Sequence, residues 1–242
     1  MQHPSVVAIH VGLPRQLEAV EGVRSDSPNA KPWVSGIIKS TVVGPVMVRR
    51  FNLDGDGQAD LVHHGGVDKA VLCYPHEHYE FWASEYSEVE WRAGCFGENL
   101  TLAGLCEADV CIGDVFQLGD ALLQVSQPRQ PCWKLSRRWG IPKLAVQVQQ
   151  TRRTGWYLRV LVEGKIESGQ PFVLTERPYS QWTIAQANEI MFAKPRRPTE
   201  ELALLECDVL SASWRETLSK RSERGESDSL QRESERLGDH SD

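Results

Sequence analysis

The sequence predicts a mainly β protein with some helix. We expect a closed antiparallel β-barrel with a few short helices, then a small C-terminal three-helix unit and a disordered tail. Two observations favour this class. Residues 1–175 consist largely of short β-branched or alternating segments separated by turn clusters, and the pattern changes to helical spacing after about residue 175. Strands of such irregular length and spacing are untypical of repeated βαβ units. They favour an antiparallel barrel instead.

The expected strands end at glycine-rich turns such as 52–57, 64–66 and 112–114. The strands themselves are 6–13, 44–53, 70–74, 115–125 and 157–163. Two helices are expected to interrupt them. One covers 76–86 and opens after Pro75, and the other covers 142–152 with a proline in its first turn.

Beyond the barrel, three short helices and a polar tail are expected. The helices are 180–192, 199–205 and 211–221, and each begins at or near Ser or Thr, which are favoured N-cap residues. Helices this short bury little alone, so we expect them to pack on the barrel. Ser, Glu, Arg and Asp dominate the last stretch, which predicts disorder. The predicted units are a barrel at 1–175, a helical unit at 176–221 and a tail at 222–242.

Bulk composition narrows the function classes. The chain has 242 residues, of which 40 % are hydrophobic and 25 % charged, and its net charge of −6 argues against a general nucleic-acid binder. No apolar run approaches the roughly 18–20 residues that span a membrane, and no signal-peptide pattern is visible. The six cysteines form no C-x-x-C pair and suggest no disulfide framework. We therefore expect a cytoplasmic protein with no membrane partner.

Charge is distributed unevenly along the chain. Residues 121–162 contain no Asp or Glu, although the chain is acidic overall. Arg and Lys are the usual phosphate ligands, so this segment is suited to bind an anion. The alternative is a solvated basic face. The cations of the segment are Arg129, Lys134, Arg137, Arg138, Lys143, Arg152, Arg153 and Arg159.

Cys132 lies inside this basic segment, in the string QPRQPCWKL. The two prolines stiffen the approach, and Leu135 and Trp139 at i, i+4 predict a short helix that begins near Cys132. Helix N–H groups and neighbouring cations both favour a thiolate, the form that binds metals or attacks electrophiles. The alternative, a buried structural cysteine, fits Cys73 and Cys111 in their apolar runs.

A second polar cluster covers 52–69. Its Asp-x-Asp-Gly start resembles a calcium loop, but the twelfth position counted from Asp54 is Gly65 instead of Glu, which excludes an EF-hand. His63 and His64 are of a type that binds zinc, yet no zinc spacing is met. Hydrogen bonding that shapes the loop is the alternative role. Serine-hydrolase, P-loop and Rossmann motifs are all missing from the sequence.

Seven strings in register carry a resemblance to the MOSC family. They are 35–39, 52–61, 64–71, 74–79, 97–101, 112–114 and 125–135. Each string is weak alone, but their order and density resemble the YiiM-type subgroup, from about residue 5 to about residue 220. The resemblance includes the small three-helix unit at the C-terminus.

The resemblance implies a molybdenum–pterin cofactor (molybdopterin) in a basic groove of the barrel. It implies that Cys132, in the Pro-Arg-x-Pro-Cys string, is the metal ligand, and that His64 lies on a floor where the backbone approaches the ligand closely. Phosphate on the pterin needs cations. The implied cofactor-binding residues are Lys39, Ser40, Asn52, Gly65, Gly66, Asn99, Arg129, Lys134, Arg137 and Arg138.

The activity that the resemblance implies is the reduction of N-hydroxylated compounds, such as N-hydroxylaminopurines, to amines. Catalytic roles fall to Cys132 and to His64 or His63, because imidazole titrates near neutral pH and can donate a proton. The chain has no visible flavin or Fe–S motif. Electrons are therefore expected from a separate flavoprotein or ferredoxin-like donor. A homodimer is left open as the assembly.

Two other functions stay open on the sequence alone. The chain is also compatible with a cofactor or sulfur carrier that uses a persulfide on Cys132. A non-catalytic anion-binding protein, with Cys132 merely buried, is the second.

Overall fold

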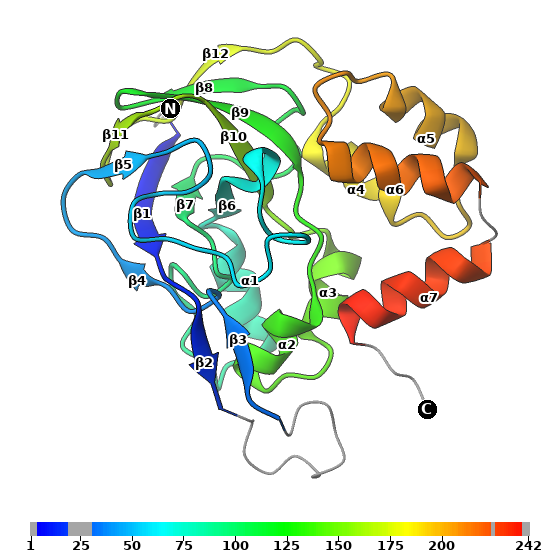
Figure 1. The fold of residues 1–242 in the computed structure, drawn as a ribbon, viewed down its shortest axis with the longest axis horizontal. Helices are drawn as coiled ribbons and strands as arrows, with labels where there is room; N and C mark the ends of the chain where they lie inside the picture. Colours follow the sequence, from blue (N-terminus) through cyan, green and yellow to red (C-terminus); the bar gives the residue numbers. More distant parts are fainter. Residues whose placement is uncertain (1–3, 19–30, 224–225, 239–242) are drawn as a thin grey trace.

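The computed structural model describes residues 4–18, 31–223 and 226–238 (Figure 1). Its centre is an eight-stranded sheet in the order β12-β8-β9-β10-β6-β7-β1-β4. The strands are β1 (Ser5–Val11), β4 (Ser40–Thr41), β6 (Val71–Pro75), β7 (Leu100–Ala103), β8 (Val115–Leu118), β9 (Ala121–Pro128), β10 (Trp156–Val162) and β12 (Val173–Glu176). Two small sheets flank it, β11 (Gly164–Ile166) with β5 (Val46–Val48) and β2 (Arg15–Leu17) with β3 (Trp33–Ser35).

The sheet is mixed and curls into a half-barrel (Figure 1). β6 and β7 pair in parallel, because the chain crosses over through helix α1 (His78–Glu85) between them, whereas a hairpin would pair antiparallel. Val6 N donates to Gln170 O, and Phe172 N donates to Pro4 O. These bonds join β1 to the chain that leads into β12, so the two sides of the curled sheet meet. The mainly β class is confirmed, with one parallel pair in place of a wholly antiparallel barrel.

The interior of the sheet holds the main core. Along β9, inward residues such as Leu123 and Val125 are buried, as expected for a strand with one face on the core. Phe116 and Phe172 stack with ring centroids 4.2 Å apart. β8 and β9 form a hairpin that turns at Gly119, where φ is +52°. The single expected strand at 115–125 is therefore two strands.

Three helices lie at one end of the barrel: α1, α2 (Trp133–Trp139) and α3 (Leu144–Thr151). They enclose a second apolar cluster that includes Tyr74, Trp82 and Phe96. Tyr74 and Phe96 stack at 4.2 Å, and Trp82 Nε1 donates to the Tyr74 hydroxyl at 2.7 Å. The packing of this cluster supports the start of α2.

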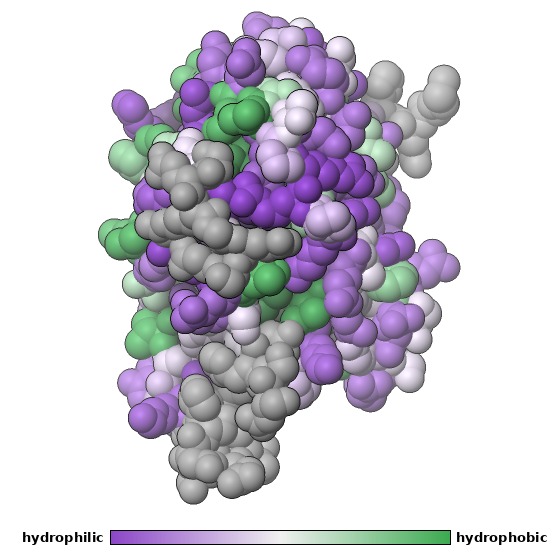
Figure 2. Space-filling model, turned by 90° about the vertical axis from the view of Figure 1, so that its right-hand side faces the viewer, coloured by the Kyte–Doolittle hydropathy of each residue, from purple (hydrophilic) through white to green (hydrophobic). Residues whose placement is uncertain are grey.

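The expected C-terminal helical unit is present as α4 (Ile184–Met191), α5 (Pro198–Leu205) and α6 (Ala212–Glu223). Thr183 and Gln186 form a capping box at the start of α4. Trp214 and Leu218 of α6 belong to the same buried cluster as β9, so the unit packs on the sheet. Its outward face, turned to the viewer in Figure 2, is covered mostly by hydrophilic residues.

The expectation of a disordered tail at 222–242 is wrong for most of that stretch. α6 continues to Glu223, and a further helix, α7, spans Glu226–Leu237. Composition suggested disorder because the segment has almost no apolar residue, but Glu233 and Arg236 dock the helix through polar contacts on α3. Residues 224–225 and 239–242 lie outside the described residues. No helix within the described ranges is long and apolar enough to cross a membrane.

Candidate functional site

A depression beside the barrel brings together much of the predicted site. It has ≈ 660 Å³ of empty space, part of which is open solvent. Its walls come from four distant segments, which explains why no single motif describes it. They are residues within 35–39, 57–64, 96–99 and 129–134, together with Lys69, Leu72 and Tyr157.

Cys132 lies in the wall of this depression, where the chain leaves β9 and enters α2. It is the N-cap of α2, in an extended conformation with φ −131° and ψ 165°. Cys132 Sγ is 3.9 Å from His64 Nε2. The helix predicted near Cys132 is present, and a sulfur and an imidazole from loops 68 residues apart share one pocket.

The two adjacent histidines have different surroundings. His64 lines the depression, and burial together with Lys134 lowers its pKa to about 4, so its imidazole is neutral at pH 7. His63 points to solvent, and its Nδ1 lies 2.9 Å from Asp60 Oδ2. Proton donation by an imidazolium at neutral pH, which the sequence led us to expect, does not fit His64. His63 does not line the depression.

The depression is electropositive. Lys39, Lys69, Arg129 and Lys134 line it, and they come from three parts of the chain, since Arg129 and Lys134 share the segment 129–134. Arg129 is 6 % exposed, and its Nη1 is buried with no hydrogen-bond partner among the residues that the structure describes. A buried guanidinium nitrogen without an acceptor is costly, so its presence here suits an anionic ligand.

Asp56 organises the floor of the site. It forms a buried ion pair with Lys39 and accepts from Gly12 N at 2.9 Å and from Asn99 Nδ2 at 2.9 Å. Burial lowers the pKa of Lys39, and the charge of Asp56 partly offsets that effect. Asn99 also accepts from Leu72 N and donates to His10 O, so its amide is engaged with the protein.

Asp56 was not among the predicted site residues. It lies in the string 52–61, which was compared with a calcium loop and which also carries part of the MOSC resemblance. Lys69, Phe96 and Tyr157 were missed as well, because a single chain shows no pairing between distant segments. The signal available for Lys69 was its place in the string 64–71.

The other predicted ligands lie outside the lining. Ser40 is exposed on β4, and Asn52 accepts from the Gln58 amide. Gly65 packs tightly on Leu61, where a Cβ would be 2.9 Å from backbone atoms, and Gly66 has φ +95°. Both glycines therefore shape the His64 loop.

Arg137 and Arg138 strengthen the walls of the site. The Arg137 guanidinium lies 5.2 Å from the ring of Trp33 and 5.6 Å from that of Trp133. Arg138 Nη1 donates to Ile37 O at 2.8 Å and to Gly94 O at 3.0 Å. These contacts tie α2 to the loops opposite, so both arginines hold the shape of the depression from behind its lining.

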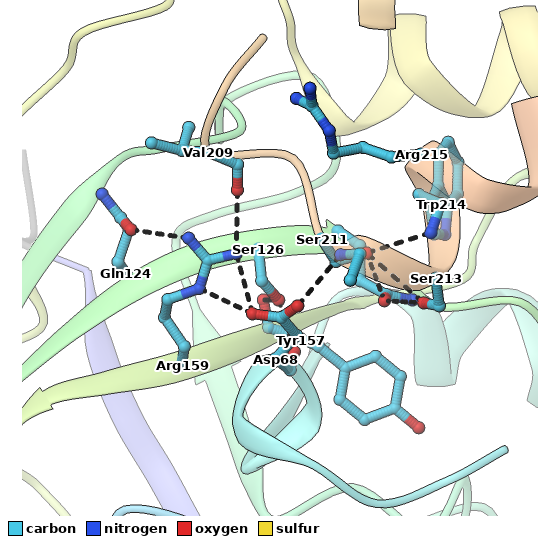
Figure 3. A network of polar contacts seen from close by, with 12 residues as sticks. Asp68, Gln124, Ser126, Tyr157, Arg159, Val209, Ser211, Ser213, Trp214 and Arg215 are labelled. Carbon is cyan, nitrogen blue, oxygen red and sulfur yellow. Dashed lines mark hydrogen bonds and ion pairs between the residues drawn. The ribbon is translucent and has the colours of Figure 1, made fainter. Parts of the chain in front are cut away.

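A polar network anchors the segment that follows His64 (Figure 3). Asp68, in the short 3-10 helix η2 (Val67–Lys69), accepts from Arg159 Nε at 2.9 Å and from Ala212 N at 3.1 Å. Arg159 also donates to Gln124 Oε1 and Val209 O. The ring of Tyr157 points away from this network in Figure 3. The His64 loop is thus fixed to β9, β10 and the start of α6 at once.

Metal chemistry at this site needs ligands beyond the protein. Within the described part of the chain, no group of three or more His, Cys, Asp and Glu side chains is arranged to hold a metal ion. One cysteine sulfur does not hold a bare ion, because protein metal sites use several ligands. Cys132 suits a metal that arrives with its own ligand set.

Comparison with known proteins agrees with the fold. Residues 60–173 match the model of the MOSC domain, and residues 182–225 match the YiiM-like 3-alpha helix domain. These two units define a MOSC-domain protein with a helical C-terminal addition. The chain belongs to the YiiM-like family of such proteins, because two relatives, of which it covers 95 % and 86 %, are 43 % and 41 % identical to it over the aligned residues.

Relatives and solved structures support that family assignment. The chain is 43 % identical over 220 residues to uncharacterized protein YflK of Bacillus subtilis, covering 91 % of this chain and 95 % of that protein. It is 41 % identical over 196 residues to protein YiiM of Escherichia coli, covering 80 % and 86 %. The crystal structure of YiiM from Geobacillus stearothermophilus is similar with a TM-score of 0.73 and 38 % identity, covering 90 % of this chain and 98 % of that one.

A further relative has a much longer chain. A protein named reductase from Gibberella moniliformis is 37 % identical over 163 residues, which are 66 % of this chain and 29 % of that protein.

Proposed function

We propose that this chain is a molybdenum-cofactor-dependent reductase that converts N-hydroxylated compounds, such as N-hydroxylaminopurines, to amines. One observation carries the proposal. The sulfur of Cys132 lies in the wall of an electropositive depression, 3.9 Å from His64 Nε2, in a MOSC-domain chain. The reductase name of one relative supports an oxidoreductase.

The residues present fit the proposed cofactor. Its phosphate needs cations, and the unpartnered Nη1 of Arg129 lies buried in the lining beside Lys69 and Lys134. Its metal carries pterin sulfurs and therefore needs only one protein ligand, which Cys132 supplies. Arg129, Lys134 and Lys69 would hold the phosphate. Asp56 would keep Lys39 charged and in place.

The bound cofactor supplies two-electron redox chemistry at molybdenum. The protein positions the substrate and limits access of water. Leu72 and Phe96 give the depression an apolar side, and a neutral His64 offers a hydrogen bond beside the Cys132 sulfur. Burial raises the pKa of Tyr157, so its phenol stays a neutral hydrogen-bond donor at pH 7. Tyr157 is the lining group with an acidic hydrogen that could pass to the leaving oxygen, and the neutral His64 would orient the substrate by a hydrogen bond.

The electrons would come from a separate flavoprotein or ferredoxin-like donor. Reduction of an N–OH group to an amine consumes two electrons and two protons and releases water. The described residues contain no cluster of cysteines and histidines that would hold an Fe–S centre. A donor outside this chain would therefore supply the two electrons.

The test replaces Cys132 with serine and measures two properties of protein made in a cofactor-competent host. We expect Cys132→Ser to lose bound molybdenum, measured by elemental analysis, and N-hydroxylaminopurine reduction together. Cys106→Ser is the matched control, because Cys106 is the other cysteine that is not buried and it lies outside the depression. A Cys132→Ser protein that kept its metal and its rate would refute the thiolate ligand. Sulfane sulfur on Cys132 without pterin fluorescence would instead indicate a carrier.

A further inference from the structure

Helix α7 lies beyond both family matches and touches the turn that carries Cys132. The match to the three-helix unit ends at residue 225, and α7 begins at Glu226. Figure 1 shows the C-terminal end of α7 next to α2 and α3. The family matches therefore do not account for this contact with the site.

The end of α7 contacts the residues on both sides of Cys132. The Arg236 guanidinium donates to Pro131 O, immediately before Cys132, and to Gln149 Oε1 of α3. Gly238 lies against Trp133, immediately after Cys132, so closely that a Cβ there would be 2.8 Å from Trp133 Cβ. One guanidinium thus joins the Cys132 turn to α3.

A second set of contacts holds α7 on the protein. Glu233 accepts from Gln149 Nε2 at 2.8 Å and pairs with Lys194 Nζ at 2.9 Å. Leu237 is 4 % exposed, whereas Leu230 is 43 % exposed. Little apolar area is buried along the described part of the helix, so polar contacts carry much of its docking. Glu233 and Arg236 both hold α7 on Gln149 of α3, but only Arg236 also donates to the turn that carries Cys132.

We propose that Arg236 is a positioning residue, which fixes the backbone next to Cys132 and thereby holds the thiol in its place in the depression. Arginine suits this role, because its planar fork can donate to two acceptors in a fixed geometry, which lysine cannot do. Supporting contacts of this kind set how precisely a ligand side chain is held. This inference rests on the proposed function in one respect only, namely the identity of the group that the Cys132 sulfur binds.

Hydrogen exchange measured by mass spectrometry on the full-length, cofactor-free protein tests this placement. Arg236→Gln removes the two charged hydrogen bonds, so we expect amide exchange in residues 130–136 to rise about tenfold. Arg236→Lys keeps one donor and should give a smaller rise. Arg49→Gln is the charge-matched control, at a solvent-exposed ion pair with Asp54, and should leave residues 130–136 unchanged.

Glu233→Gln separates the two roles of α7. It weakens the docking of the helix but leaves Arg236 in place, so exchange in 130–136 should rise less than in Arg236→Gln. An equal rise would show that α7 acts only as a cover and would overturn the proposal, as would unchanged exchange in Arg236→Gln.

Cofactor retention gives a second readout. Molybdenum should leave Arg236→Gln faster on dialysis than the parent protein, with Arg236→Lys between them, and equal rates would contradict the positioning role. A chain that binds no molybdenum in any variant would refute the proposed function instead. The exchange experiment would still decide on Arg236.

Discussion

Arg129 carries an energetic cost that a ligand would relieve. Its buried Nη1 has no acceptor among the described residues, and such a group costs about 1–3 kcal/mol. We therefore expect Arg129→Met to leave the cofactor-free protein as stable as the parent or more so. The same change should abolish most of the stabilisation by inorganic phosphate, seen as a loss of the Tm rise in thermal unfolding. Arg49→Gln, at an exposed ion pair, should keep the full phosphate effect. A drop in stability with unchanged phosphate response would contradict an anion site at Arg129.

Cys106 and Cys132 differ in their surroundings, although both are partly exposed. Burial, together with Glu107, Glu77 and Asp109, raises the pKa of Cys106 to about 12. Because this folded pKa is raised, the thiol stays protonated below pH 9 and ionises only as the pH approaches 12. At pH 8.5 we expect iodoacetamide to label Cys132 first and Cys106 roughly a thousandfold more slowly than an ordinary cysteine. Peptide mass spectrometry reads this out. Early labelling of Cys106 would show that the acidic surroundings are absent in solution.

The η2 segment is the element that joins the site to the C-terminal unit. Asp68 bonds Arg159 of β10 and Ala212 N at the start of α6 in one partly buried network. We expect Asp68→Asn to lower the free energy of unfolding by about 2 kcal/mol, since charged hydrogen bonds are lost. Urea unfolding measures this change. Asp54→Asn breaks a solvent-exposed pair with Arg49 and should cost below about 1 kcal/mol. Similar losses for both variants would show that the network does not fix this segment.

The sequence predicted elements best where one local signal decided them. The helix after Cys132 follows from two prolines and an i, i+4 repeat, and α4 was expected from residue 180, three residues before its cap at Thr183. The hairpin at Gly119 was merged into one strand, because β8 and β9 are apolar on both sides of a short turn. The hairpin of β2 and β3 was missed, since its strands have three residues each. α7 was missed because its docking is polar.

The sequence predicted those site residues that lie in the basic segment or that the MOSC resemblance implied. Six of the proposed residues line the depression: Lys39, His64, Asn99, Arg129, Cys132 and Lys134. Asp56 acts from behind the lining, and Tyr157 enters from a strand whose burial pattern shows no special role. Such placements depend on the pairing of distant strands. Spacing along one chain does not encode that pairing.

On the scale of the whole molecule, the barrel and the C-terminal unit share one core. Leu218 of α6 is fully buried in the same cluster as Leu123 and Val125 of β9. We therefore expect a single cooperative unfolding transition in calorimetry, despite two family matches along the chain. Leu218→Ala should destabilise that one transition by about 3 kcal/mol, because the cavity forms inside the shared core. Leu202→Ala, at a position on α5 that is 56 % exposed, should change it by less than about 0.5 kcal/mol. Two separate transitions, with only the smaller one shifted by Leu218→Ala, would show that the helical unit folds on its own and does not support the barrel.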